Sequence, residues 1–332
     1  MKIPISIILP FYNCKDTLGA SIESILSQTY KSFELILIDN NSDSESYDIA
    51  ADYAAQDSRI RLISESRQGI VPALNTGIEQ AAGKYIARMD ADDISFPERF
   101  ELQYNYLEKN PDVELVASAV NYIGNEEENY GFLEYVKWNN RLLSHEDISL
   151  NRFIESPLVH PSVMFRKELI EKYGAYREGD FSEDYELWLR FLHHGVKMFK
   201  LKESLLDWKD SETRLTRTDD RYSTLAFFET KTYYLFEWLK ENNSFHPVVA
   251  IWGAGRKSRE RFALLHDLGV SPKFFIDLHA NPNRHVIEYT YTPPAGKTFI
   301  VSYVANREGR EKIKEFLVNL GYIEGKDFIC VE

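Results

Sequence analysis

Cysteine is nearly absent from this chain of 332 residues, which contains only Cys14 and Cys330. Two cysteines are too few for the disulfide framework of small secreted proteins, and such usage is typical of a reducing cytoplasm. Long apolar runs are also lacking, since no stretch approaches the roughly 18–20 apolar residues that a membrane-spanning helix needs. We therefore expect a cytoplasmic protein, whose only membrane contact would be peripheral, at the inner face of the cytoplasmic membrane.

Positive charge is scarce relative to negative charge. The chain has 39 Lys and Arg residues against 52 Asp and Glu residues, which gives a net charge of −13. Because no local run of basic residues offsets this balance, we expect no nucleic-acid partner. The length and the hydrophobic content of 44% suffice for two domains with sizeable cores.

Strand-like and helix-like segments alternate through the first hundred residues. Short, mostly apolar runs lie at 5–9, 35–38, 60–63 and 85–88, and the segments between successive runs carry apolar residues at helical spacing. Repeated βαβ units predict an α/β fold, a mostly parallel sheet with helices on both faces. Ligands of such sheets bind beyond the carboxyl ends of the strands. Later segments are less regular: we expect a helix at 96–110, an excursion from the sheet at 124–156, and two short strands at 196–200 and 204–208.

A second series of strand and helix signals begins near residue 248, after the turn-forming residues 242–244. Gly253, Ala254 and Gly255 follow its first strand and resemble the glycine-rich turn of a Rossmann-type unit, with Asp277 near the fingerprint distance. Ser258 stands in place of the third glycine, so a bound small ligand and a structural role in dimer formation, acceptor placement or docking both stay open. The domains predicted are 1–222, a linker helix at 223–245, and a Rossmann-like domain at 246–332.

Three acidic residues, Asp90, Asp92 and Asp93, directly follow a buried-strand signal. Alternation along an extended chain points Asp90 and Asp92 to one side, where their oxygens could share a divalent cation such as Mg²⁺ or Mn²⁺. Such an ion usually completes its shell with substrate phosphates, which predicts a nucleotide-diphosphate site. An acidic strand-to-loop turn is the simpler alternative. Asp39 ends another strand, so we expect it to lie near Asp90.

A series of motifs in the first 220 residues resembles the family-2 glycosyltransferases, which have the GT-A nucleotide-diphospho-sugar-binding fold. The matching segments are residues 6–13, 24–30, 33–42, 68–69, 74–78, 83–87, 90–93, 160–166 and 183–190. Each is weak alone, but their order and spacing make coincidence a poor explanation. The resemblance implies an inverting, metal-dependent transfer of a sugar from a nucleotide-sugar donor, with a UDP-sugar favoured. The acceptor would be a hydroxyl of a glycan or a lipid-linked saccharide, in bacterial surface-polysaccharide biosynthesis.

The resemblance also assigns residues to the donor nucleotide. Those expected to bind it are Pro10, Phe11, Tyr12, Asn13, Asp39, Asn40, Gln68, Asp90, Ala91, Asp92, Lys209, Arg214 and Arg217. Many relatives carry Asp where this chain has Asn40, so the base stays open, and an Asx-type turn is the alternative for Asp39 and Asn40. A solvated surface loop is the alternative for the three basic residues.

Metal ligation is expected from Asp92, with Asp90 and His160 close to the ion, although His160 is equally compatible with a structural role. Asp93 is expected to cap the helix that follows. Arg88 could meet a phosphate or form a strand-edge salt bridge.

The expected general base is Asp184, with Glu183 in reserve. Inverting transfer needs one carboxylate to accept the proton of the attacking hydroxyl. A simple helix cap is the alternative for this pair. Two competing functions are a sugar nucleotidyltransferase and a non-catalytic nucleotide-sugar-binding or scaffold subunit of an assembly complex. The glycine-rich basic loop of a nucleotidyltransferase is missing after the first strand. The presence of Asp90, Asp92 and Asp184 argues against a non-catalytic subunit. A homodimer is left open.

Overall fold

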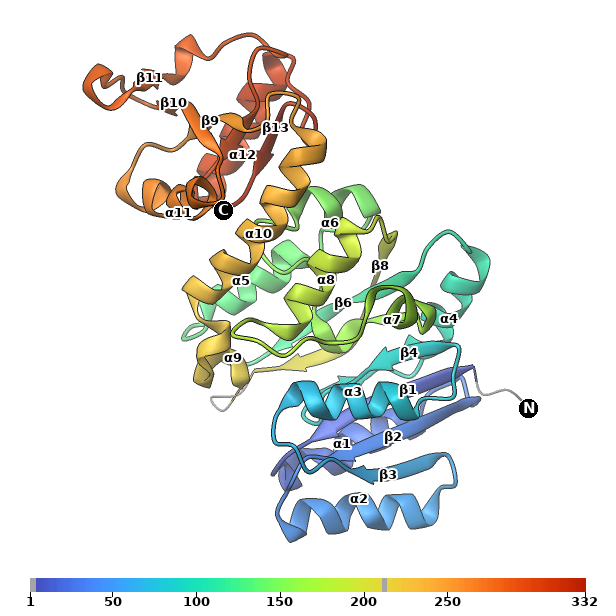
Figure 1. Cartoon of the computed structure of the whole chain (residues 1–332). Helices are drawn as coiled ribbons and strands as arrows, with labels where there is room; N and C mark the ends of the chain where they lie inside the picture. Colours follow the sequence, from blue (N-terminus) through green and yellow to red (C-terminus); the bar gives the residue numbers. More distant parts are fainter. Residues whose placement is uncertain (1–3, 211–213) are drawn as a thin grey trace. The chain divides into compact units, whose positions relative to one another are not determined.

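The computed structural model describes residues 4–210 and 214–332 (Figure 1). The chain divides into two compact units. The first contains the described residues up to Ile148 together with Pro157–Asp219, and the second contains Ser149–Ser156 and Asp220–Glu332. Ser149–Ser156 thus belongs to the second unit, although both of its flanking segments belong to the first.

The first unit is built on one eight-stranded sheet with the order β3-β2-β1-β4-β7-β6-β8-β5. Its strands are β1 (Ile5–Phe11), β2 (Phe33–Asp39), β3 (Ile60–Ser64), β4 (Tyr85–Arg88), β5 (Ile94–Ser95), β6 (Leu115–Ile123), β7 (Met164–Arg166) and β8 (Met198–Lys209). Strands β1 to β4 are parallel, as predicted. The rest of the sheet is mixed, because β7 runs antiparallel to β4 and β6, and β5 runs antiparallel to β8.

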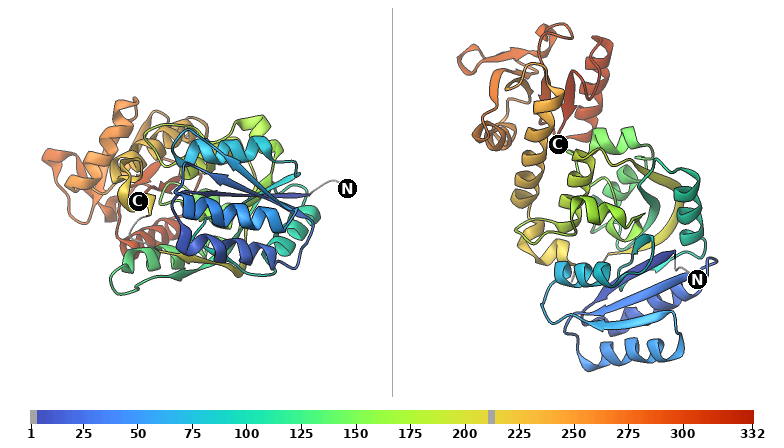
Figure 2. Two further views of the ribbon diagram at one scale, coloured as in Figure 1. Left: turned by 90° about the horizontal axis from the view of Figure 1, so that it is seen from below. Right: turned by 45° about the vertical axis from the view of Figure 1, so that its right-hand side comes forward.

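Helices cover both faces of this sheet, which confirms the predicted α/β architecture (Figure 2). One face packs against α1 (Lys15–Leu26), α2 (Ser44–Gln56), α4 (Arg99–Lys109) and α5 (Tyr130–Asn139). The other packs against α3 (Ile70–Gln80), α6 (His145–Asn151), α7 (Glu168–Tyr173) and α8 (Glu183–His193). Strand alternation explains the two cores: Ile7 and Leu9 lie in the first, and Ile8, between them, lies in the second.

The segment 124–156 lies outside the sheet, as expected, and it contains the helices α5 and α6. Two local predictions for this unit were wrong. The two short strands expected at 196–200 and 204–208 form the single strand β8. The pairing of β8 with β6 shifts register near Ala119, which accommodates the polar interruption in β8. Helix α4 begins at Arg99 with Glu98 at its N-cap position, so Asp93 does not cap it. Strand β5 intervenes, because Ile94 pairs with Asp207 of β8.

The second unit contains a five-stranded sheet with the order β11-β10-β9-β12-β13, in which all neighbours are parallel. Its elements are η2 (Asp220–Tyr222), α10 (Thr224–Asn242), β9 (Val248–Trp252), α11 (Arg256–Asp267), β10 (Ser271–Asp277), η3 (Pro282–Arg284), β11 (Val286–Glu288), η4 (Tyr289–Tyr291), β12 (Ile300–Ser302), α12 (Arg307–Asn319) and β13 (Phe328–Cys330). The Asp277 carboxylate accepts a hydrogen bond from the Ala254 N–H (2.8 Å). Across the described ranges, no helix has the length and apolar character required to cross a membrane.

Candidate active site

The carboxyl ends of β1 and β2 are joined by a hydrogen-bonded turn. The Asn40 N–H donates to the Phe11 carbonyl (3.0 Å), and the Ser42 N–H donates to Asp39 Oδ1 (3.0 Å). The buried Asp39 carboxylate therefore holds the turn that follows β2. Asn13 accepts from the Asp43 N–H and has φ 47°, a left-handed conformation that Asn tolerates. Pro10 and Phe11 are buried in β1, and Tyr12 projects beyond the strand, 53% exposed.

Asn40 connects the end of β2 to the loop between β3 and α3. Its Nδ2 donates to the carbonyls of Glu65 (3.0 Å) and Arg67 (2.8 Å), and its Oδ1 accepts from the Gly69 N–H (2.8 Å). Gln68 Nε2 donates to the same Oδ1 at 3.4 Å. These bonds use both amide hydrogens of Asn40, which favours a role in shaping the pocket over direct contact with a base.

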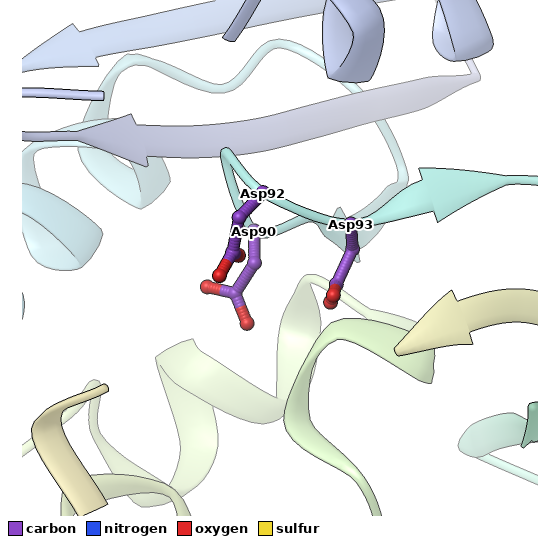
Figure 3. Close-up of side chains that lie close together, drawn as sticks. All are labelled: Asp90, Asp92 and Asp93. Atoms are coloured by element: carbon purple, nitrogen blue, oxygen red, sulfur yellow. The ribbon is translucent and has the colours of Figure 1, made fainter. Parts of the chain in front are cut away.

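The three aspartates after β4 form one acidic group. Ligand oxygens of Asp90, Asp92 and Asp93 all lie within 4.8 Å of one another. The Asp90 and Asp92 side chains lie next to each other, and Asp93 stands apart at the start of β5 (Figure 3). Asp93 is fully buried; its Oδ1 accepts from the Lys209 N–H (2.8 Å), and its Oδ2 has no hydrogen-bond partner among the described residues. This bond fixes the start of β5 against the end of β8.

The acidic group fits a divalent cation on electrostatic grounds. Burial, and then the charge of Asp90, raise the pKa of the Asp92 carboxyl. Burial and the charges of Asp90 and Asp92 raise the pKa of Asp93 far above its usual value. Carboxylates that destabilise each other in this way are stabilised when a cation is shared between them. Because hard oxygen ligands suit Mg²⁺ and Mn²⁺, Asp90 and Asp92 are the residues that would hold such an ion.

Arg88, the last residue of β4, faces Asp90 on one side. Its guanidinium is buried and forms an ion pair with the Asp90 carboxylate. Burial acts to lower the pKa of Arg88, but the charge of Asp90, the Tyr176 hydroxyl and the charge of Glu183 outweigh it and raise that pKa. The strand-edge salt bridge considered for Arg88 is therefore present, and the guanidinium also faces the start of α8.

Asp184 lies in the first turn of α8. The Ser182 hydroxyl donates to Asp184 Oδ1 (2.5 Å), and the Tyr185 N–H donates to the same oxygen (2.7 Å). Burial raises the pKa of the Asp184 carboxyl, while these hydrogen bonds and the charge of Arg88 act to lower it. The N-cap residue of α8 is Ser182, so neither acid of the pair occupies the cap position. A raised pKa suits a group that accepts a proton near neutral pH.

His160 lies between Tyr176 and Glu183. Its Nε2 is 2.7 Å from the Tyr176 hydroxyl, and its Nδ1 is 3.9 Å from Glu183 Oε1. Burial and the positive charge of Arg88 lower the His160 pKa, which keeps the ring neutral. Among the described residues, His160 is outside the one group whose geometry could hold a metal ion, so its contacts favour a positioning role.

Two further residues complete the site without having been singled out in the sequence. Tyr176 is held by Asn75, which donates to its carbonyl (2.9 Å) and accepts from its N–H (3.1 Å). Burial raises the pKa of the Tyr176 hydroxyl, and the charges of Glu183, Asp184 and Asp90 add to this rise while the charge of Arg88 opposes it. Burial, together with the charges of Asp92, Asp43 and Asp39, raises the pKa of the Cys14 thiol to about 12. The ends of β1, β2 and β4 and the start of α8 therefore surround one region.

The three basic residues expected on a loop after the last strand have different surroundings. Lys209 is the last residue of β8 itself, and only Arg214 and Arg217 follow the strand. The Arg214 guanidinium lies 4.0 Å from the Trp208 ring, donates to the Lys209 carbonyl (2.9 Å), and acts to lower the pKa of Asp92. Arg217 instead pairs with Asp210 (2.6 Å). Arg214 is thus the member of this trio that faces the acidic group.

Comparisons with known proteins agree with this architecture. The family described as "Glycosyl transferase family 2" matches residues 6–174. The O-antigen biosynthesis glycosyltransferase WbnJ of Escherichia coli is 35% identical over 242 residues, which cover 71% of this chain and 89% of WbnJ. The putative glycosyltransferase EpsE of Bacillus subtilis is 35% identical over 224 residues, 66% of this chain and 77% of EpsE.

The crystal structure of S. aureus TarS 1-349 in complex with UDP-GlcNAc has a TM-score of 0.58 and 15% sequence identity, and the match covers 80% of this chain and 71% of that one. At this identity the likeness concerns the fold, which is the GT-A type predicted from the motifs. Taken with the family match over residues 6–174, it leads to one assignment: the chain is a glycosyltransferase and belongs to glycosyl transferase family 2.

Proposed function

We propose that this glycosyltransferase is inverting and metal dependent, and that it transfers a sugar from a UDP-sugar to a hydroxyl of a glycan or lipid-linked saccharide. The observation that carries the proposal is the placement of Asp90 and Asp184 around the same buried guanidinium, Arg88. This arrangement supports a cation-binding role for Asp90 and a base role for Asp184, at the edge of the sheet where ligands of parallel strands bind.

The donor side is supported by the ends of three strands. Asp39 and the turn from Tyr12 to Asn13 would hold the nucleoside, and Asp90 and Asp92 would hold Mg²⁺ or Mn²⁺. The ion, when bound, would neutralise charge that develops on the departing nucleoside diphosphate. Arg214 carries positive charge toward Asp92 and would stabilise the same phosphates. The TarS structure, with UDP-GlcNAc bound to this fold, supports UDP as the donor nucleotide.

The acceptor side is assigned to the start of α8. Asp184 would take the proton of the acceptor hydroxyl while its oxygen bonds to the anomeric carbon and the bond from that carbon to the diphosphate breaks. Ser182 and the Tyr185 N–H hold the Asp184 carboxylate in one orientation, which a base in an inverting transfer requires. Glu183 stays in reserve, because it is buried beside His160 and Arg88.

The setting proposed is surface-polysaccharide assembly. WbnJ is named for O-antigen biosynthesis, and AmsE of Erwinia amylovora, 34% identical over 206 residues (60% of this chain, 74% of AmsE), is named for amylovoran biosynthesis. A lipid-linked acceptor would place the enzyme at the inner face of the cytoplasmic membrane.

Calorimetric titration with UDP and GDP, each with and without Mn²⁺, tests the donor site. We expect UDP binding that depends on Mn²⁺, that is lost in Asp92→Ala, and that persists in Asp184→Asn. Asp112→Ala is a matched control, since Asp112 is an exposed acid paired with Lys197 (3.2 Å). UDP binding that survives both Asp92→Ala and removal of the metal would overturn the metal assignment.

A further inference from the structure

Arg88 is a charged residue whose side chain is almost completely shielded from solvent. Its side chain is 4% exposed, and its Nε has no hydrogen-bond partner among the residues described. A buried charged group with an unsatisfied donor is costly for folding unless neighbouring charges compensate it. Here the acids of the candidate active site compensate the positive charge of Arg88. The cost of burying the guanidinium therefore depends on those acids.

The charges around Arg88 are divided between two sides. Asp90, from the turn after β4, pairs with the guanidinium directly, and its carboxylate is 25% exposed. Glu183 and Asp184, at the start of α8, interact with the same guanidinium from another element, and Glu183 is only 3% exposed. Without the positive charge of Arg88, the acids of both elements could bind one divalent ion between them or bind a second ion.

We propose that Arg88 is a positioning residue that acts as a built-in cation, so that the site takes one divalent ion at Asp90 and Asp92 and leaves the α8 carboxylates to the acceptor. This inference rests on the proposed metal-dependent function and goes beyond it by naming the residue that separates the two sets of acids. The guanidinium competes with the ion for Asp90 and repels a second ion from Glu183 and Asp184.

The inference makes a prediction that a purely structural role would not make. Removing the positive charge should strengthen binding of divalent ions, because the site becomes more negative and both Asp90 oxygens become available. Because charges this close in a partly buried site are only weakly screened, we expect a gain of about tenfold in Mn²⁺ affinity, or a second bound ion. Loss of a structural arginine would instead weaken Mn²⁺ binding or leave it unchanged.

Arg166 supplies a matched control within the same pair of strands. It lies on β7 opposite Tyr85, at the amino end of β4, whereas Arg88 is at the carboxyl end. Its side chain is buried and donates to the carbonyls of Val113 (3.1 Å) and Leu107 (2.7 Å). An Arg166→Met variant therefore loses a buried guanidinium of the same sheet without a change of charge near the aspartates.

The test is a titration of the purified full chain with Mn²⁺, in which free Mn²⁺ is followed by electron paramagnetic resonance. We expect one ion in the wild type and in Arg166→Met, and about tenfold tighter binding or a second ion in Arg88→Met. Arg88→Lys, which keeps the charge and is more easily accommodated, should bind Mn²⁺ as the wild type does. The thermal midpoint of each variant, measured alongside, shows that the protein is folded.

The outcomes separate this inference from the proposed function. Weaker or unchanged Mn²⁺ binding in Arg88→Met, with the wild type binding one ion, overturns the role of Arg88 and leaves the metal site intact. Equal gains in Arg88→Met and Arg88→Lys also overturn it, because the effect would then not follow charge. Mn²⁺ binding by Arg88→Met alone would support the built-in cation and refute metal dependence of the wild type. Absence of binding in both would refute both proposals.

Discussion

Replacing Asn40 by Asp tests whether this residue supports the donor pocket through its backbone contacts. The side chain is 4% exposed, and Nδ2 donates to the Glu65 and Arg67 carbonyls at 3.0 and 2.8 Å. Asn40→Asp keeps the size and the acceptor for the Gly69 N–H (2.8 Å), but it turns the donor into an oxygen that faces two carbonyl oxygens. The substitution therefore removes the two donated bonds and leaves the accepted one in place.

The expected magnitude follows from these contacts. Each of the two carbonyls that loses its donor costs about 1–3 kcal/mol, so we expect the free energy of unfolding to fall by about 2–6 kcal/mol at neutral pH. For a unit of this size that corresponds to a decrease of roughly 5–20 °C in Tm. Because the introduced carboxylate is destabilised by burial, its folded-state pKa would be raised. The loss should therefore be largest above that pKa and should shrink as the pH falls and the group becomes protonated.

Urea unfolding of the first unit, followed by tryptophan fluorescence, measures the effect. Asn41→Asp is the matched control: the same chemical change is made one residue later, at an exposed side chain whose φ of 63° Asp also tolerates. We expect Asn41→Asp to change the free energy of unfolding by about 0.5 kcal/mol or less. Wild-type stability in Asn40→Asp, or an equal loss in both variants, would refute the role assigned to the buried amide.

Three further predictions concern single groups. Asp184→Asn should lower the rate of transfer by about 10²–10⁴-fold and preserve UDP binding, and full activity would exclude Asp184 as the base. Hydrogen bonds from Arg67 and Thr76 lower the pKa of Glu65 to about 2 from the usual 4.5, so this stabilisation exists above pH 4.5 and disappears as the pH falls toward 2. Thr76→Val should therefore lower the free energy of unfolding of the first unit at neutral pH, and it should make that free energy fall less steeply between pH 4.5 and 2. A decrease of equal size at every pH would contradict the explanation. In the second unit, burial lowers the pKa of Lys231 to about 7 from 10.5, so unfolding binds a proton between these values and stability should rise from pH 7 to 10.5. Lys231→Met should abolish this rise in the free energy of unfolding, measured with urea. A rise of unchanged slope in the variant would show that Lys231 is not its source.

The parallel half of the sheet could be predicted from the sequence because its determinants are local. The aliphatic runs of β1 to β4 and the helical spacing of α1 to α3 each express burial within a few residues of chain. The acidic turn after β4 is also a local feature, and its position at the carboxyl edge follows from the parallel topology.

Interactions between distant residues account for the predictions that failed. Asp93 follows a strand and precedes a helix, which suggests a cap, but pairing of Ile94 with Asp207 makes a strand there instead. Phe132 and Tyr135 of α5 pack against Trp208 of β8, with ring centroids 6.1 Å apart in each case, and no periodicity within 124–156 reveals that partner. Such contacts override local pattern.

The surroundings of Arg88 could not be predicted for the same reason. The sequence shows an arginine at the end of an apolar strand, and both a phosphate contact and a salt bridge fit that pattern. Tyr176, Glu183 and Asp184, which face its guanidinium or depend on its charge, come from about ninety residues further along the chain. Likewise, the bonds of Asn40 to the carbonyls of Glu65 and Arg67 appear only in three dimensions.

The most direct test of the account is a crystal structure of the wild-type enzyme with Mn²⁺ and UDP, with the metal located by its anomalous scattering. The account predicts one manganese peak at the Asp90 and Asp92 carboxylates, in contact with the UDP diphosphate, and no peak at Glu183 or Asp184. A nucleotide bound elsewhere, or a diphosphate bound at the strand ends with no manganese between it and Asp92, would contradict it.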